Sequence, residues 1–196
     1  MGDMTYYIDT NVLISYLFVS EHNHIISQKI LENIANQRHT LYGSTITFVE
    51  MYNTICRKIR GGRWKFIDPI QKYLEKITNS ENRCKLVIAI IYELLKERLG
   101  IKFVDCKDLY EFEKFEIGKH ALYVPQIFKV LLEELTPKLT IRFKDLIHLA
   151  YVYMLSKICN IDIKYFLTFD VEDFGKIKNH IKQALGIEIV SPLSPP

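Results

Sequence analysis

A short apolar run that ends on an acid opens the chain. Residues 5–8 precede Asp9, and an apolar helix start follows at Val12. A run that is short and apolar throughout, and is followed by a turn, is typical of a strand buried in a parallel sheet. In open α/β sheets, ligands bind at the carboxyl ends of the strands. Asp9 is therefore expected at the edge of the sheet where a binding site forms.

The same alternation continues along the chain and predicts an α/β fold. Apolar runs of strand length alternate with longer segments that carry apolar residues at helical spacing. This order predicts a mostly parallel, five-stranded sheet with helices on both faces. The expected strands cover residues 5–8, 40–45, 101–104, 164–168 and 187–190. The expected helices cover residues 11–18, 21–36, 47–60, 66–79, 83–98, 107–117, 122–135, 142–158 and 173–184.

Length and composition fit one domain with a sizeable core. The chain has 196 residues, of which 48% are hydrophobic, and no Pro/Gly/Ser-rich linker divides it. We therefore expect a single domain over residues 1–196, in which residues 61–138 form a helix-rich elaboration. The net charge of +3 is too small to predict nucleic-acid binding by itself.

The expected location is the cytoplasm, without a membrane anchor. The N-terminus places an acid before a strand, which is unlike a signal peptide. The longest apolar runs are far too short to span a bilayer. The four cysteines are widely spread and show no zinc-binding spacing, so we expect reduced thiols.

Further acids follow other predicted strands or begin other predicted helices. Glu50 and Asp145 lie near helix starts, and Asp170 and Asp173 follow the strand at 164–168. Acids at the ends of several elements can converge, and converging carboxylates repel one another and raise each other's pKa. A divalent cation relieves this repulsion, and oxygen ligands suit Mg²⁺ or Mn²⁺ rather than Zn²⁺. With such an ion, the cluster becomes a plausible site for phosphodiester hydrolysis.

Four segments, in this order, carry a resemblance to a known family. Residues 7–14 (YIDTNVLI), 47–53 (TFVEMYN), 144–150 (KDLIHLA) and 166–174 (FLTFDVEDF), the last followed by 186–190 (GIEIV), resemble the motifs of PIN-domain ribonucleases. The resemblance covers roughly residues 5–60 and 139–192. It implies a PIN-like, three-layer α/β/α fold and a metal-dependent endoribonuclease that cleaves RNA with Mg²⁺ or Mn²⁺.

The resemblance also implies which residues carry the chemistry. Asp9, Glu50 and Asp145 take the three core acidic positions. The fourth position is open between Asp170, which we favour because it lies nearer the strand end, and Asp173, which could instead cap the helix it begins. The implied catalytic residues are thus Asp9, Glu50, Asp145 and Asp170, and Asp173 joins them as a possible metal ligand.

Small polar residues beside the acids have two readings. Thr10, Asn11 and Thr168 could orient the carboxylates or metal-bound waters. They could equally serve as turn and cap residues. His148 follows Asp145 by three residues on the same helix face, and we expect a core or supporting histidine there rather than a metal ligand.

One dense basic stretch contains the only tryptophan of the chain. Cations next to an aromatic side chain suit single-stranded RNA. The alternative is that these cations only complement the carboxyl end of the helix at 47–60. The candidate RNA-binding residues are Arg57, Lys58, Arg60, Arg63, Trp64 and Lys65.

The partners and the biological role have several interpretations. The compact family members called VapC-type toxins act in toxin–antitoxin pairs, but residues 61–138 make this chain longer, so the antitoxin partner stays open. Apolar stripes within 61–138 favour a homodimer interface or a raised wall beside the site. A non-catalytic RNA-binding or scaffolding module and a structure-specific DNA nuclease are the alternative functions. A phosphotransferase with an aspartate nucleophile is disfavoured, because Asn11 stands where its second aspartate belongs.

Overall fold

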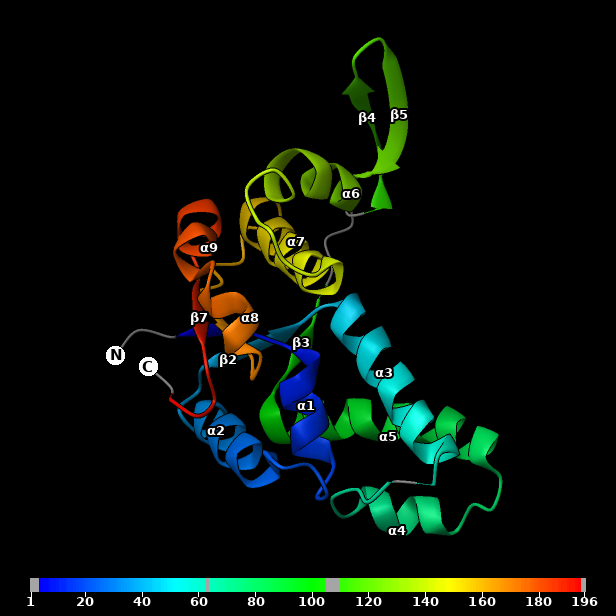
Figure 1. Cartoon of the computed structure of the whole chain (residues 1–196). Helices are drawn as coiled ribbons and strands as arrows, with labels where there is room; N and C mark the ends of the chain where they lie inside the picture. Colours follow the sequence, from blue (N-terminus) through cyan, green and yellow to red (C-terminus); the bar gives the residue numbers. More distant parts are fainter. Residues whose placement is uncertain (1–3, 63, 105–109, 195–196) are drawn as a thin grey trace.

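The first strand of the chain lies at the centre of a parallel sheet, and the later strands lie on both sides of it. The computed structural model describes residues 4–62, 64–104 and 110–194. In these ranges a five-stranded parallel sheet has the order β3-β2-β1-β6-β7 (Figure 1). β1 and β6 are neighbours although most of the chain separates them, so the strand order reverses between them. Its strands are β1 (Thr5–Ile8), β2 (Thr40–Gly43), β3 (Lys102–Phe103), β6 (Tyr165–Leu167) and β7 (Glu188–Val190).

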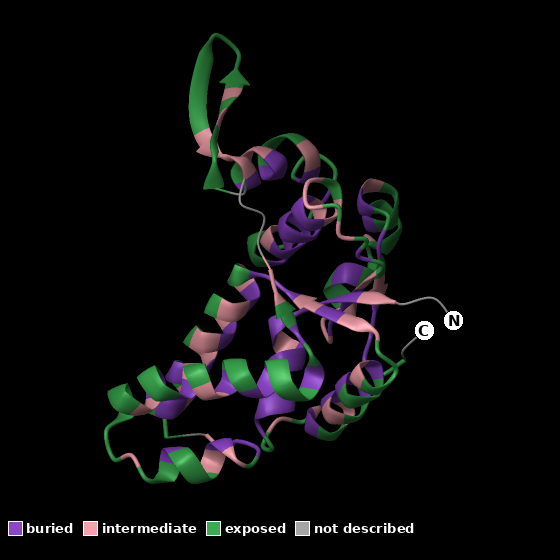
Figure 2. Ribbon diagram, turned by 180° about the vertical axis from the view of Figure 1, so that it is seen from behind, coloured by how far each residue is buried: buried purple, intermediate pink, exposed green. Residues whose placement is uncertain are grey.

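Helices cover both faces of this sheet, which confirms the predicted three-layer α/β/α fold. Tyr6 and Ile8 of β1 face one hydrophobic core, whereas Tyr7 faces the other, as strand alternation requires. Figure 2 shows the buried residues on the inward sides of the helices and along the sheet. The first core contains α1 (Thr10–Leu17), α2 (His24–Asn36), α3 (Thr45–Arg60) and α5 (Ser80–Leu99). The second contains α7 (Phe143–Lys157) and α9 (Lys178–Leu185).

Two of the expected helices are shorter or divided. The helix expected at 66–79 is reduced to α4 (Ile70–Glu75), which begins directly after Pro69. The helix expected at 173–184 is split into α8 (Val171–Gly175) and α9. Helix α5, in contrast, extends beyond the expected range at both ends.

A β-hairpin replaces helices that the sequence pattern predicted. Residues 112–117 and 120–125 form β4 (Phe112–Ile117) and β5 (His120–Pro125), so the expected helix at 107–117 is wrong over its described part, and 107–109 lie outside the described residues. The helix expected at 122–135 is wrong over its first four residues, which belong to β5. The remainder is helical, as α6 (Gln126–Val130) and a π-helical turn over Leu131–Leu135.

The physical reason for the hairpin is its turn. Gly118, with φ of 59°, and Lys119 connect the strands in two residues, and a glycine at positive φ favours such a tight hairpin turn. Phe112 and Phe115 have a helical spacing, but aromatic and β-branched residues also favour strands. The hairpin extends away from the body of the protein (Figures 1 and 2).

The cysteines only partly match the expectation of reduced thiols. Cys56 and Cys84 are free and buried. Cys159 is disulfide-bonded, which contradicts the expectation at that position, and Cys106 lies outside the described residues. No helix of the described part of the chain has the length and apolar character needed to cross a membrane.

Candidate metal centre

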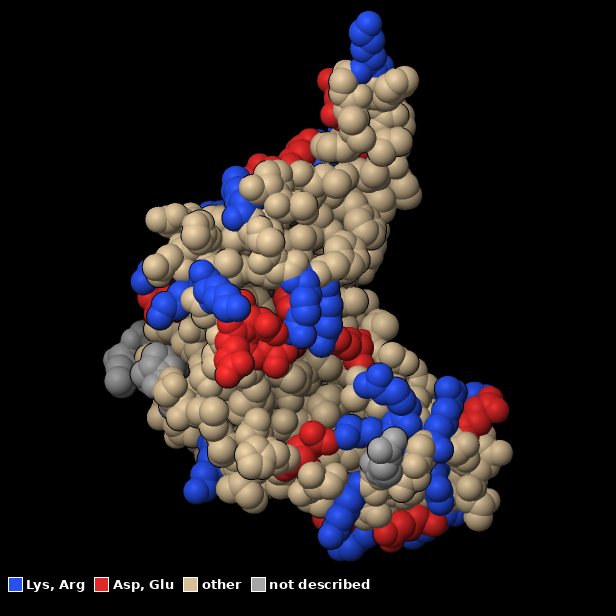
Figure 3. Space-filling model, in the orientation of Figure 1, with Lys and Arg blue, Asp and Glu red and all other residues tan. Residues whose placement is uncertain are grey.

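The candidate site lies at the carboxyl ends of β1 and β6, where the strand order reverses. The backbone N–H of Asp9 donates to the carbonyl of Leu167 at 3.0 Å, so the ends of the two strands are joined. In open α/β sheets this reversal opens a crevice in which ligands bind. Figure 3 shows acidic side chains gathered near the middle of one face, with Lys and Arg beside them.

Asp9 is the innermost acid of the site. Its residue is only 3% exposed. It occupies the position before α1, yet its side chain makes no capping hydrogen bond to the helix. One carboxylate oxygen, Oδ2, accepts a hydrogen bond of 2.7 Å from Thr168. The other, Oδ1, is buried and has no hydrogen-bond partner among the described residues. A buried carboxylate oxygen without a donor is costly unless a cation or water satisfies it.

Glu50 approaches Asp9 from helix α3. Its Oε2 accepts hydrogen bonds from Thr10 at 2.7 Å and from His148 Nε2 at 3.0 Å. Its Oε1 forms an ion pair with Lys144 at 2.8 Å. One ligand atom each from Asp9, Glu50 and His148 lies within 4.8 Å of the others. Two strands and three helices therefore bring their side chains to one point.

A buried hydrogen-bond network fixes α3, and with it Glu50, against β1. Tyr7, which points to the opposite face from Ile8, places its hydroxyl 2.6 Å from Ser44 and 3.0 Å from Thr47. These two residues form the capping box that starts α3. The same hydroxyl lies 3.1 Å from His148 Nδ1, and His148 reaches Glu50 through its other ring nitrogen. His148 therefore contacts Glu50 directly, and a supporting rather than a metal-binding role for this histidine stays a prediction.

The outer acids gather around one arginine. Asp145, in the first turn of α7, is 2% exposed and accepts a hydrogen bond of 2.8 Å from Arg142 Nε. Arg142 Nη2 lies 3.3 Å from Asp170 and 2.8 Å from Asp173. Both candidates for the fourth acidic position therefore contact the same guanidinium, and the contacts do not choose between Asp170 and Asp173.

The two inner carboxylates have pKa values that shift in opposite directions. Burial raises the pKa of Asp9, although His148, Thr168 and Lys144 partly oppose the shift. Burial also acts to raise the pKa of Glu50, but the hydrogen bonds that it accepts from His148, Lys144 and Thr10 outweigh burial and lower it to about 2. Asp9 is therefore the acid whose negative charge is least compensated, and Glu50 is held ionised.

The small polar residues make the contacts that an orienting role requires. Thr10 donates to Glu50 and Thr168 donates to Asp9. Asn11 Nδ2 donates to Thr168 at 3.0 Å, while its Oδ1 accepts from the backbone N–H of Phe169 at 3.2 Å. Asn11 thus ties the loop after β6 to the start of α1. A role in chemistry for these residues remains a prediction.

The basic stretch lies at the end of α3 and beyond it. Arg57, Arg60 and Lys65 are exposed. Lys58 is less available, because it pairs with Glu21 and lies 5.0 Å from the ring centre of Phe18. Trp64 is partly buried, and its ring is covered by the Arg83 guanidinium at 4.9 Å. Arg63 lies outside the described residues. RNA binding by this stretch remains a prediction.

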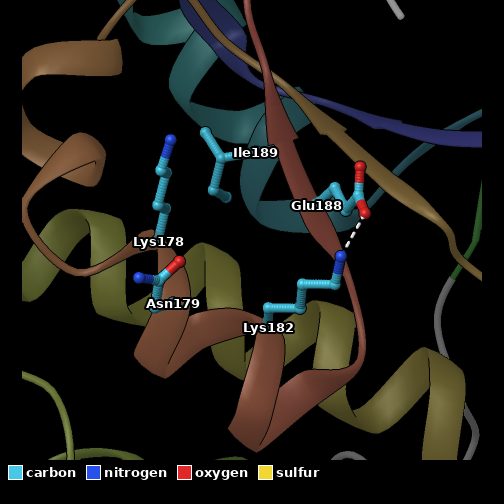
Figure 4. Close-up of a pocket in the computed structure, with 5 residues that line it drawn as sticks. All are labelled: Lys178, Asn179, Lys182, Glu188 and Ile189. Carbon is cyan, nitrogen blue, oxygen red and sulfur yellow. Dashed lines mark hydrogen bonds and ion pairs between the residues drawn. The ribbon is translucent and has the colours of Figure 1, made fainter.

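The surface also has a pocket that is separate from the candidate acids. A pocket of about 250 Å³ is lined by residues of α9 and β7, and Lys182 crosses it to pair with Glu188 at 2.5 Å (Figure 4). The lysine and the glutamate satisfy each other, and the pocket contains none of the candidate acids. We therefore place the candidate site at the strand ends rather than in this pocket.

The sheet order and the acids at its strand ends define a class of parallel α/β protein with a candidate cation site. Residues 6–177 match the model of the PIN domain family, and the chain therefore belongs to the PIN domain family. Among solved structures, VapBC2 from Rickettsia felis bound to a DNA fragment from their promoter aligns with 13% identity and a TM-score of 0.47. The alignment covers 96% of this chain and 98% of that chain. No curated protein matches the sequence.

Sequence reasoning missed two cations of the site, Arg142 and Lys144. Arg142 directly precedes α7, and Lys144 lies in its first turn. Arg142 contacts Asp145 and Lys144 contacts Glu50, and both of these acids were predicted site residues. The spacing of three residues between Arg142 and Asp145, at the start of a predicted helix, was the available indication. Tyr7 was also missed, because its hydroxyl is hidden within an apolar strand pattern.

Proposed function

We propose that this protein is a metal-dependent endoribonuclease that hydrolyses phosphodiester bonds of RNA. The observation that carries the proposal is the buried Oδ1 of Asp9, which has no hydrogen-bond partner in the described part of the chain and lies beside Glu50. Membership of the PIN domain family supports the same class of chemistry. Asp9, Glu50, Asp145 and Asp170 are the proposed catalytic residues.

The residues present fit a hard divalent cation. Asp9 and Glu50 offer carboxylate oxygens at the centre of the site, and Asp145, Asp170 and Asp173 offer more nearby. Carboxylate oxygens suit Mg²⁺ or Mn²⁺. The chemistry that such an ion would supply is neutralisation of phosphate charge and activation of a water nucleophile.

The surrounding residues orient the inner acids and keep Glu50 ionised. Thr168 and Thr10 each donate to one inner carboxylate and thereby fix its orientation. Lys144 keeps Glu50 ionised and is itself half exposed, with 51% of its side chain accessible. An exposed cation beside ionised acids can attract a phosphate of the substrate. The basic stretch at the end of α3 would extend this attraction along the strand of RNA through Arg57, Arg60 and Lys65.

The test is an RNA cleavage assay with added Mg²⁺ or Mn²⁺. We expect cleavage that a chelator abolishes and that Asp9→Asn removes, since this substitution deletes one charge with little change of volume. The matched control is Asp162→Asn, because the Asp162 side chain is 80% exposed and pairs only with nearby Lys164 among the described residues.

The outcomes of this assay separate the alternatives. RNA binding without cleavage would favour a non-catalytic module. Cleavage of branched or flapped DNA with intact RNA would favour a structure-specific DNA nuclease. Cleavage by Asp9→Asn at the wild-type rate would contradict the role of Asp9.

We further propose that the nuclease acts as the toxin of a toxin–antitoxin pair in the cytoplasm. Membership of the PIN domain family, which includes the VapC-type toxins that the sequence motifs resemble, supports this role. Growth arrest on expression, which is relieved by Asp9→Asn or by co-expression of a protein encoded next to this chain, would support the toxin role. Growth unaffected by the active nuclease would contradict it.

We propose that residues 61–138 belong to one PIN-like domain over 1–196 and mediate association of two copies. The hairpin supports this proposal, because opposed residues of its two strands place Phe115, Ile117, Leu122 and Val124 on one face. Leu122 and Ile117 are each 50% exposed. An isolated two-stranded hairpin gains stability only by packing against something else. Light scattering that shows a dimer lost in Leu122→Lys would support the proposal, and a monomer at high concentration would contradict it.

A further inference from the structure

One arginine side chain contacts all three outer acids of the site. Arg142 Nε bonds to Asp145 at 2.8 Å, and Nη2 lies 2.8 Å from Asp173 and 3.3 Å from Asp170. Arg142 lies directly before α7, and Asp145 lies in its first turn, so helix geometry brings these two together. Asp170 and Asp173 come from the start of α8, which follows β6. The guanidinium therefore ties two separate elements together.

The inner and outer acids differ in their partners. Glu50 has Lys144 and His148, whereas the Oδ1 atom of Asp9 has no hydrogen-bond partner among the described residues. The outer acids already share a permanent cation, since a guanidinium does not lose its proton in proteins. Its planar fork presents several N–H donors, which allows one side chain to serve several carboxylates. The arginine thus does for the outer acids what a metal ion would do.

The charges of the site also indicate that it accepts one divalent ion rather than two. Asp9, Glu50, Asp145, Asp170 and Asp173 contribute five negative charges, and Arg142 and Lys144 contribute two positive ones, so three negative charges remain. One divalent ion reduces that excess to one, whereas two would leave the site with a positive excess. The two ions of a two-metal site lie only about 3.5–4 Å apart and both need ligands, and the outer carboxylates that could supply these ligands are bonded to Arg142.

We propose that Arg142 takes the place of a second metal ion and limits the site to one divalent cation, held by the inner acids Asp9 and Glu50. This inference rests on the proposed metal-dependent function. It narrows the set of metal ligands given under the proposed function, because it assigns the outer acids Asp170 and Asp173 to Arg142 rather than to metal. Asp145 shares a feature with each group: it is buried, as Asp9 is, but it bonds to the arginine, as Asp170 and Asp173 do.

The test counts bound Mn²⁺ ions by electron paramagnetic resonance, in which the signal of free Mn²⁺ disappears on binding. The wild-type protein should bind one ion per chain. Arg142→Gln, which removes the charge from a side chain that is 58% exposed, should bind two. The matched control is Lys85→Gln, which breaks an exposed ion pair with Glu81 on α5, away from the acids, and should still bind one ion.

Variants of the exposed Asp173 give a second measurement that does not depend on Arg142→Gln being well folded. Asp173→Asn in the wild-type background should leave the count at one, because the proposal gives this acid no metal. In the Arg142→Gln background, Asp173→Asn should return the count from two toward one, since the second ion would then lose a ligand.

Each result has a definite meaning. Two ions bound by the wild type, loss of the ion in Asp173→Asn, or an unchanged count in Arg142→Gln would overturn the proposal while leaving the metal-dependent function intact. No Mn²⁺ bound by the wild type would instead refute the metal centre of the proposed function, and the inference with it. Loss of the single ion in Asp9→Asn is the result that identifies the inner site.

Discussion

Replacing the central acid of the proposed catalytic site should make the metal-free protein more stable. Asp9 is 3% exposed, its Oδ1 atom has no hydrogen-bond partner among the described residues, and burial raises its pKa. Folding therefore moves this carboxylate to a place where its negative charge is poorly compensated. Asp9→Asn removes this charge, and the amide oxygen of the new side chain can still accept the hydrogen bond from Thr168.

The size of the effect follows from the cost of one unsatisfied buried group. Such a group costs about 1–3 kcal/mol, and more when it is charged. For a chain of this length, 1 kcal/mol corresponds to about 2–4 °C in Tm. We therefore expect Asp9→Asn to raise the Tm by roughly 2–12 °C in the presence of a chelator at pH 7. Thermal melts followed by circular dichroism measure this difference, with Asp162→Asn as the exposed control.

Low pH and a bound metal ion should each remove the higher stability of Asp9→Asn. The pKa of Asp9 is raised, so the destabilisation is fully present above that raised pKa and decreases as the pH falls from it toward the ordinary pKa of an aspartate. The difference between variant and wild type should therefore shrink in acid. A divalent ion at 1,000 times its Kd would stabilise the wild type by about 4.1 kcal/mol, which exceeds the cost of about 1–3 kcal/mol and reverses the order. A variant less stable than the wild type with chelator at pH 7 would refute this reasoning.

Three further predictions concern the surroundings of the site. His148→Phe should lower the free energy of unfolding by about 1–3 kcal/mol in urea titrations, because both Tyr7 and Glu50 lose a buried partner. Since the pKa of Glu50 is lowered to about 2, its contribution to stability is complete above its usual value and is lost as the pH falls toward 2; Glu50→Gln should flatten that part of the acid unfolding curve. Arg60→Ala combined with Lys65→Ala should weaken RNA binding on all sequences and reduce the salt slope by about one unit per lost phosphate contact, and an unchanged slope would mean that these cations only close the helix.

The sheet and the positions of the inner acids could be predicted because both depend on local patterns. A buried strand must be apolar along its length, so the runs before Asp9 and Thr168 identified β1 and β6. Acids that follow such runs meet at one edge of a parallel sheet whatever their distance in the sequence. The bounds of these strands agreed with expectation to within a few residues, as at β2 and β3.

The hairpin could not be predicted in the same way. Phe112, Phe115 and Ile117 fit a helical spacing and a strand almost equally well over so short a segment. The strands pair only with each other, so they lack the long apolar run that marks a buried strand. Gly118 decided the outcome, since a glycine at positive φ in the turn stabilises a hairpin and terminates a helix.

The arrangement around Arg142 explains why a list of acids is not enough to predict a metal site. The sequence showed five carboxylates that could converge, and each was a reasonable metal ligand. Which of them can still bind a metal ion depends on the orientation of the Arg142 side chain. Neither the spacing of the residues nor the composition of the sequence determines that orientation. Because Arg142 bonds to Asp145, Asp170 and Asp173, the acids divide into an inner group that lacks positive charge and an outer group that has it. The choice between Asp170 and Asp173 as a fourth ligand then loses its importance, since the arginine holds both.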